Sequence, residues 1–488
     1  MKRKYNILFI TLLFPSIVLS QKPLTKEQVL EDYKVLKNVL IKGHPSLYDF
    51  TAKPEWDRLF IDFEESTLKT IKNDNELYKS IIELTDYVRD GHLIVMHPPV
   101  DSIPNLFPLL LKIIEGQFYT DTDDFGIPVG SEIVSIDGIE GMELRKRLLK
   151  YAPSDGFNTS KKDRQVEREF GILLFYEFGA KSTYQVTYKT PANQEIIRHI
   201  ESQPFESMGK RFIKRNSYFS IYHHRENKAD FVKNTLGKKE PFLYFIDSMN
   251  TAVLTLNTFG LNQEKFQLEL KELFKEIKRK KVEQLVIDIR QNEGGYPENS
   301  NEAFSYIAKE SFVQPKSQHV ITSQLPHKEH SQEIINDYTY ESFFEQYFQN
   351  SSQIENEWVI YAPEDEASMA PIKKGFEGQV YVLVGGKTFS AGSTFALNCK
   401  NQGITLIGEE TGGGYYSHTG GYPVIYELPH SKIKMMMSYV KVKKYVKDET
   451  VKKGTGVIPD VEVNLTVQDL IKGKDSQLDY VLKQINKK

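Results

Sequence analysis

The chain has 488 residues and only one cysteine, Cys399, so an intrachain disulfide cannot form. Ala396 and Leu397 precede this cysteine in an apolar stretch, which predicts a buried and unreactive thiol. The chain also has little net charge: 63 basic and 66 acidic residues give a formal charge of −3. A nearly neutral chain has no overall field that would attract nucleic acid, and we expect no nucleic-acid partner.

Long hydrophobic runs are also missing, because no segment after the first twenty residues approaches the length of a membrane span. The run at residues 7–19 is short and follows three basic residues at positions 2–4. Val18 and Ser20 place small or modest side chains where a signal peptidase would cut. We therefore predict that residues 1–20 are a signal peptide. The mature chain would be periplasmic or secreted, without stable membrane insertion; a short uncleaved anchor is the alternative.

The length predicts more than one domain, since a single hydrophobic core seldom organises so long a chain. Apolar residues recur at steps of three and four in residues 24–97, which predicts a helical domain over residues 21–100. A strand closed by Asp137-Gly138 and an alternating strand at 184–188 predict a small β domain over residues 101–205. Its order of elements resembles that of a PDZ domain, a module that binds extended peptides at a sheet edge.

The remaining residues, 206–488, alternate between short apolar runs and amphipathic stretches. The predicted strands are 252–256, 285–289, 380–384 and 404–407, and the clearest predicted helix is 391–400. Repeated strand–helix–strand order predicts an α/β fold with a parallel sheet and right-handed crossovers. Ligands of such sheets bind beyond the carboxyl ends of the strands, so the loops that follow the strands are the candidate site.

One of these loops places Ser390 at the start of a predicted helix. Backbone N–H groups are unpaired there and the helix dipole favours negative charge, which suits an acyl-transfer nucleophile and its oxyanion. Gly294 and Gly295 follow another strand and would let a second backbone segment approach the same point. Taken locally, Ser390 could equally be a helix N-cap.

A nucleophilic serine needs a base, and His92 is the strongest candidate among the eleven histidines. It follows Asp90-Gly91 at the end of a helical segment. His327 and His330 have metal-ligand spacing but no evident third ligand, so we predict no metal site there.

Four segments together resemble the motifs of the C-terminal-processing, or tail-specific, serine peptidases. Residues 287–295 resemble the family's D-x-R-x-N-x-G-G signature, and 388–391 resemble its nucleophile motif. Residues 408–414 match G-E-x-T-x-G-G, and 456–460 match G-V-x-P-D. The four occur in the family's order, which makes the resemblance specific.

The chain departs from one branch of that family, which uses a serine–lysine dyad. The lysine would follow the G-E-x-T segment, but residues 414–417 read Gly-Tyr-Tyr-Ser. Asp90-Gly91-His92 instead resembles the histidine motif of the tricorn-like branch, in which a histidine from an earlier segment is the base. The resemblance also implies a supporting acid shortly before Gly456, for which Asp448 and Glu449 are the candidates.

The resemblance implies a ClpP/crotonase-like α/β catalytic domain behind the helical and PDZ-like domains. It implies an exported serine endopeptidase that cuts polypeptides through an acyl-enzyme on Ser390, with His92 as general base. The backbone N–H groups of Ala391 and of Gly294 or Gly295 would form the oxyanion hole. The chemistry needs no metal and no organic cofactor.

Two other functions remain open from the sequence. A catalytically silent protein that binds peptides or apolar ligands could have the same fold, because function resides in the site and not in the fold. An esterase could use the same serine on other acyl groups.

The predicted signal peptide has a direct test. Cleavage after residue 20 would leave Gln21 as the mature N-terminus, with or without cyclisation. Intact-mass measurement of the protein from its native cell envelope should give that mass. A cytosolic species that retains Met1 would contradict export.

Overall fold

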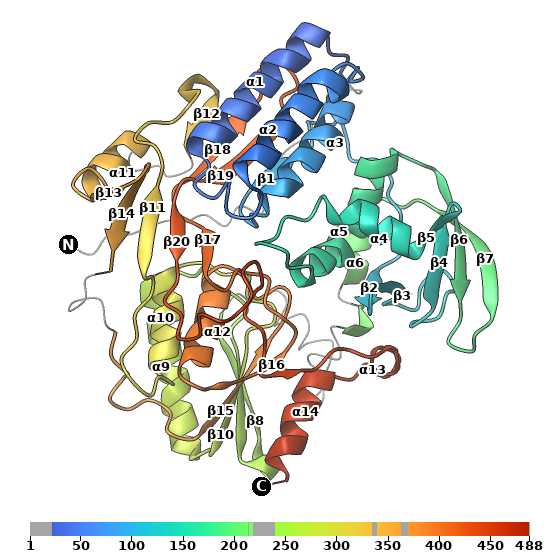
Figure 1. Ribbon diagram of the computed structural model, residues 1–488. Coiled ribbons are helices and arrows are strands. Elements are labelled where there is room, and N and C mark those ends of the chain that lie inside the picture. The colour runs from blue at the N-terminus through green and yellow to red at the C-terminus, as the bar shows by residue number, and fades with distance from the viewer. Residues whose placement is uncertain (1–21, 213, 218–239, 334–338, 363–368, 488) are drawn as a thin grey trace.

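The computed structural model describes residues 22–212, 214–217, 240–333, 339–362 and 369–487. The predicted signal peptide lies outside the described residues. The fold is mixed α/β, as the sequence predicts, with helices at the N-terminal end and several sheets beyond them (Figure 1). No helix in the described ranges combines the length and apolarity that a membrane crossing requires.

The N-terminal region is helical, as predicted. Its elements are α1 (Lys26–Gly43), α2 (Lys53–Asp62), the π-helical turn η1 (Phe63–Thr67), α3 (Asp74–Thr85) and the 3₁₀ turn η2 (Asp86–Val88). Thr25 and Gln28 form a capping box that fixes the start of α1. The helical run ends at Arg89, whose left-handed backbone (φ 56°) turns the chain away from η2. The turn leads directly into Asp90-Gly91-His92.

A small β domain follows. Its elements are β2 (Leu111–Ile114), β3 (Gln117–Thr120), β4 (Glu132–Ile136), β5 (Ile139–Glu140), α4 (Gly141–Leu149), α5 (Ser160–Phe178), β6 (Thr183–Lys189), β7 (Glu195–Glu201) and α6 (Phe205–Phe212). Its strands pair in the order β2-β3-β4-β6-β7. Asp137 and Gly138 both have positive φ, so the predicted tight turn after β4 is confirmed. The likeness of this domain to PDZ modules stays a prediction.

The central sheet has the strand order β21-β16-β15-β10-β9-β8. The strands are β8 (Phe242–Ile246), β9 (Thr251–Thr255), β10 (Gln284–Asp288), β15 (Gln379–Val384), β16 (Thr405–Gly408) and β21 (Val461–Glu462). All neighbouring pairs are parallel except β8 with β9, so the predicted parallel sheet is confirmed.

Successive residues of the central strands pack on opposite faces of the sheet. Leu254 of β9 and Ile287 of β10 belong to the core beneath one set of helices, whereas Val253 belongs to the core on the other face. The helices of the first face are α9 (Gln263–Lys280), α10 (Pro297–Ser305) and α12 (Ala391–Asn401); α14 (Ser476–Ile485) covers the second, and α13 (Val467–Lys472) precedes it. Cys399 of α12 is fully buried and free, as the sequence predicts.

Two antiparallel sheets join the N-terminal helices to this α/β unit. Their strand orders are β1-β19-β18-β12 and β13-β14-β11-β20-β17. The strands are β1 (Ile94–Met96), β11 (Ser317–Val320), β12 (Ser331–Glu333), β13 (Ser352–Ile354), β14 (Glu357–Tyr361), β17 (Ser417–Thr419), β18 (Pro423–Glu427), β19 (Lys434–Ser438) and β20 (Lys441–Lys443), with α11 (Tyr340–Tyr347) beside them.

The strand β1 begins two residues after His92 and pairs antiparallel with β19, with Val95 opposite Met435. A segment of the helical region is thereby built into a sheet whose other strands come from the last third of the chain. The sequence does not reveal this pairing, because β1 is short and only partly buried. Its effect is to hold His92 against the α/β unit.

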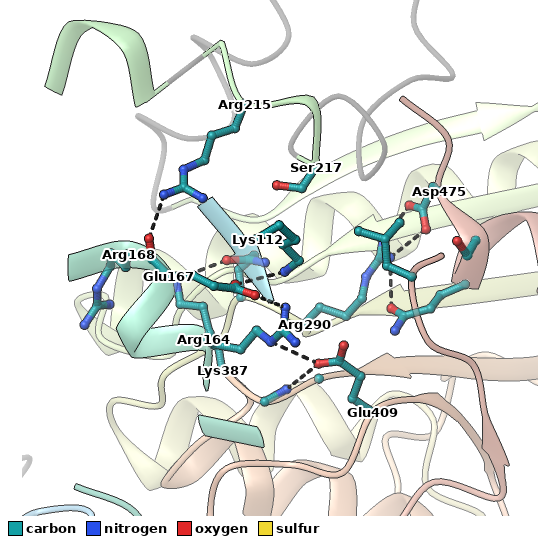
Figure 2. Close-up of a pocket in the computed structure, with 16 residues that line it drawn as sticks. Lys112, Arg164, Glu167, Arg168, Arg215, Ser217, Arg290, Lys387, Glu409 and Asp475 are labelled. Carbon is teal, nitrogen blue, oxygen red and sulfur yellow. Dashed lines mark hydrogen bonds and ion pairs between the residues drawn. The ribbon is translucent and has the colours of Figure 1, made fainter. Parts of the chain in front are cut away.

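A buried ion-pair network anchors the carboxyl edge of the central sheet. Arg290 follows β10, and its guanidinium donates to Asp288 and, through two nitrogens at 2.7 and 2.8 Å, to Asp475 at the start of α14 (Figure 2). The side chains of all three residues are at most 7% exposed. The two-pronged geometry makes this contact specific to arginine.

Arg290→Met should destabilise the α/β unit, because it leaves the carboxylates of Asp288 and Asp475 buried without a counter-charge. The expected loss in the free energy of unfolding is about 3–5 kcal/mol. Denaturant titration followed by circular dichroism measures it. Lys53→Ala removes a fully exposed ion pair with Asp57 and should leave the midpoint unchanged. Equal midpoints for both variants would contradict a structural role for Arg290.

Candidate active site

Ser390 lies between β15 and α12 in a backbone conformation that non-glycine residues seldom adopt (φ 52°, ψ −123°). Strain of this kind persists where the surrounding structure enforces it, often at functional sites. Although Ser390 occupies the N-cap position of α12, its side chain makes no capping hydrogen bond. The N-cap interpretation therefore does not account for its hydroxyl.

The hydroxyl of Ser390 instead faces His92. The distance from His92 Nε2 to Ser390 Oγ is 3.2 Å, although the two residues are 298 positions apart in the chain. The His92 ring also packs against the Phe389 ring, with centroids 4.6 Å apart. This separation is within the reach expected of a nucleophile and its base.

Two buried carboxylates, those of Asp90 and Asp155, lie near the His92 ring. Asp90 Oδ1 is 3.9 Å from His92 Nδ1, and this buried Nδ1 forms no hydrogen bond with the described residues. Asp90 accepts hydrogen bonds from Thr419 Oγ1, from the His92 N–H and from His44 Nε2. Because the Ser46 N–H donates to His44 Nδ1, the proton of His44 must be on Nε2.

Asp155, between α4 and α5, was not predicted from the sequence. It accepts the Gly91 N–H at 2.8 Å with one oxygen and the Gly414 N–H at 2.9 Å with the other. The carboxylate thus bridges the loop that carries His92 and the G-E-x-T loop of the α/β unit. In the sequence, an isolated aspartate in a loop cannot be distinguished from the aspartates that are common in turns.

Asp90, His92 and Asp155 could also be considered as a metal site, because one ligand atom from each lies within 4.8 Å of the others. It is the one such group among the described residues, so His327 and His330 do not form one there. Every carboxylate oxygen of Asp90 and Asp155 already accepts a hydrogen bond from the protein. The donor arrangement fits a role in orienting the imidazole.

Gly294, Gly295 and Ala391 lie beside Ser390 with different donor capacities. Gly294 has φ 104°, and a Cβ added there would lie 2.7 Å from Ser390 Cβ, so the close approach requires glycine. Its N–H already donates to Asn292 Oδ1 at 2.9 Å. The N–H groups of Gly295 and Ala391 have no acceptor among the described residues, which leaves them available to an oxyanion.

Asp448 and Glu449, the acids predicted to support the base, lie on an exposed stretch after β20. The Asp448 carboxylate accepts hydrogen bonds from the N–H and the hydroxyl of Thr450. In the described structure neither residue contacts His92, whose acidic neighbours are Asp90 and Asp155.

A lysine does approach the site, from the residue directly after β20 and not from the G-E-x-T segment. Lys444 Nζ donates to Ser393 Oγ at 2.9 Å and to the Gly414 carbonyl at 2.8 Å. Burial lowers the pKa of Lys444 to about 8, opposed by the charge of Asp155. Lys387, which is nearer to Ser390 in sequence, contacts Gln291 and Glu293 instead.

The electrostatics favour a neutral imidazole at position 92. Burial lowers the pKa of His92 below its ordinary value of 6.5, while the charges of Asp155 and Asp90 oppose this shift. The positive charges of Lys161 and Lys444 lower it further. A histidine that is unprotonated at neutral pH can accept a proton from a hydroxyl.

Residues 250–463 match the sequence profile of peptidase family S41. The structure of mature CPAF complexed with lactacystin superposes with a TM-score of 0.65 at 14% identity, over 95% of this chain and 99% of that one. A second structure of mature CPAF gives a TM-score of 0.61 at 14% identity, over 95% and 98% of the two chains. At this identity the superpositions show the fold alone.

A search of curated proteins gives no significant match. The matched profile nevertheless spans both loops that meet at Ser390, together with most of the parallel sheet that carries them. Residues 250–463 therefore match a family S41 peptidase domain, and the chain is a serine-type peptidase.

Proposed function

We propose that this chain is an exported endopeptidase of the tail-specific type, in which Ser390 is the nucleophile and His92 the general base. The observation that carries the proposal is the 3.2 Å separation of His92 Nε2 from Ser390 Oγ, within a site built from three distant parts of the chain. Tail-specific cleavage and export rest on the sequence resemblance and on the predicted signal peptide.

The geometry supports a two-step acyl transfer. Ser390 Oγ attacks the peptide carbonyl carbon as His92 Nε2 takes its proton, and the carbonyl oxygen becomes an oxyanion. The N–H groups of Ala391 and Gly295 donate to that oxyanion. When the C–N bond breaks, His92 returns the proton to the leaving amine. Water, deprotonated by the same imidazole, then hydrolyses the acyl-enzyme and regenerates the Ser390 hydroxyl.

Asp90 and Asp155 support the base in this mechanism. The Asp90 carboxylate lies 3.9 Å from His92 Nδ1, where it favours the tautomer that leaves Nε2 free to accept a proton, and the charge of Asp155 acts on the same imidazole. His44 and Thr419 hold Asp90 in place. Burial would raise the pKa of Asp90, but the hydrogen bond and charge of His44, with the charge and N–H of His92, keep it below the ordinary value.

Ser390→Ala should abolish peptide hydrolysis without unfolding the protein, because the lost hydroxyl caps no helix. Turnover should fall by at least about a thousandfold. A fluorophosphonate probe should label the wild type and the exposed-helix control Ser66→Ala, but not Ser390→Ala. Mass spectrometry of the cleaved peptides locates the cut.

The outcomes of that experiment also separate the alternatives. A silent binding protein would show no labelling and no hydrolysis in the wild type. An esterase would hydrolyse acyl esters but leave every peptide intact. Undiminished hydrolysis by folded Ser390→Ala would contradict the nucleophile.

The identity of the base is tested by the acidic limb of the pH–rate profile. With His92 as base, the rate of the wild type should fall as pH drops through a pKa below 6.5. Lys444→Met removes a positive charge that lowers this pKa, so the limb should move to higher pH while activity remains.

Lys387→Met is the matched control, because the Lys387 ammonium contacts Glu293 and not the groups around His92. The acidic limb of the pH–rate profile of this variant should coincide with that of the wild type. His92→Ala should be inactive. If Lys444 were the base, Lys444→Met would be inactive and His92→Ala would retain its rate.

A further inference from the structure

A second cleft adjoins the proposed catalytic site. It encloses about 670 Å³, within the range of roughly 300–1,000 Å³ typical of ligand sites. Its walls come from the loop after α1, from the sheet β13-β14-β11-β20-β17 and from the segment between β20 and β21. Figure 1 shows β20 and β17 between the N-terminal helices and the central sheet, where this cleft lies.

The floor of the cleft is one face of that antiparallel sheet. Lys443 of β20 is opposite Ser317 of β11 on one side and Ser417 of β17 on the other. Lys441 is two residues away on the same strand and opposite His319. Residues directly opposite or two apart point to the same face, so these side chains form one surface.

The surface has an excess of positive charge. Five lysines line the cleft, namely Lys316, Lys441, Lys443, Lys444 and Lys453, against three acids, Asp49, Asp155 and Glu449. Lys441 is paired with Asp49 at 2.6 Å, and Asp155 is held by two backbone N–H groups. Across the described ranges, Lys316, Lys443 and Lys453 form no ion pair.

The cleft adjoins the residues of the proposed catalytic site. Asp155 and Gly414 line it, and the N–H of Gly414 donates to Asp155, whose other oxygen accepts the N–H of Gly91 beside His92. The neighbouring residue, Gly413, lies against Ser390, since a Cβ added to it would be 3.1 Å from the Ser390 nitrogen. This adjacency would let a polypeptide held at Ser390 extend toward the cleft.

Another cavity with many charges contrasts with this one. It encloses about 90 Å³ at the carboxyl edge of the central sheet, between that sheet and α5 (Figure 2). Its basic side chains are neutralised within the protein: Lys112 pairs with Glu167, and Arg164 with Glu167 and Glu409. Paired groups of this kind leave no charge for a ligand, in contrast to the three lysines of the larger cleft.

We propose that the lysine-lined cleft binds carboxylate groups of the polypeptide substrate, so that segments rich in Asp and Glu beside the scissile bond are preferred. The proposal rests on the proposed peptidase function for the cut itself. Tyr361, Tyr415 and Val451 provide apolar walls for the stems and neighbouring side chains of such a segment. Lys443 and Lys316 provide the charges.

Binding to Ser390→Ala protein tests the preference without relying on turnover. Three fluorescein-labelled peptides differ only in charge: one has Glu side chains and an amidated end, one has Gln in their place and an amidated end, and one has Gln and a free α-carboxylate. Fluorescence anisotropy should give a Kd for the Glu peptide about threefold to tenfold below that of the amidated Gln peptide, with the difference shrinking as salt is raised.

The third peptide distinguishes the source of the carboxylate. If it binds as tightly as the Glu peptide, the cleft receives a C-terminal α-carboxylate; if it binds like the amidated Gln peptide, the cleft receives acidic side chains. Equal Kd values for all three peptides would overturn the proposal.

Lysine variants locate the effect in the cleft. Lys443→Gln and Lys316→Gln should each weaken binding of the Glu peptide about threefold or more, whereas Lys271→Gln, an exposed lysine of α9 outside the cleft, should not. Lys443→Glu should favour a matched peptide with Lys in place of Glu. An unchanged preference in Lys443→Glu would contradict the assignment. Charge-dependent binding by a wild type that cuts none of the peptides would refute the peptidase proposal and leave the binding inference intact.

Discussion

The structure depends above all on the bridge that Asp155 forms between the N–H of Gly91 and the N–H of Gly414. One of these groups belongs to the loop of His92, the other to the loop that packs against the Ser390 turn. Burial raises the pKa of Asp155, with the charge of Asp90 adding to it, while His92 and the two N–H groups oppose that shift. A single carboxylate thus links the loop of His92 to the loop beside Ser390, and its charge raises the pKa of the imidazole.

Most polar groups around that bridge have hydrogen-bond partners. Asp90 is satisfied by His44, Thr419 and the backbone, Lys444 by Ser393 and Gly414, and Asn292 by two backbone groups. Buried polar groups cost free energy when they are unpaired, so these contacts fix the loops in a single arrangement. His92 Nδ1 and the N–H groups of Gly295 and Ala391 stay unpaired among the described residues, and the proposed chemistry would use all three.

The central sheet, the helix after Ser390 and the approach of His92 to that serine could be predicted from the sequence alone. The first two follow from local hydrophobic periodicity, and the third from family motifs. The bridge formed by Asp155 and the pairing of β1 could not be predicted, because both depend on contacts between segments far apart in the chain. Asp448 and Glu449 illustrate the same limit: a position in the sequence near Gly456 does not place a carboxylate near an imidazole, and the exposed backbone after β20 faces solvent.

The pairing of β1 with β19 determines when, during synthesis, the site around His92 can form. Residues 94–96 leave the ribosome, and any export channel, long before residues 434–438 that complete their sheet. At about 5–20 residues per second, the intervening length takes tens of seconds to synthesise. Until then the imidazole of His92 has no sheet to hold it beside a serine that itself emerges late. In the proposed mechanism, a chain of this topology becomes active only after the residues of β19 have been made.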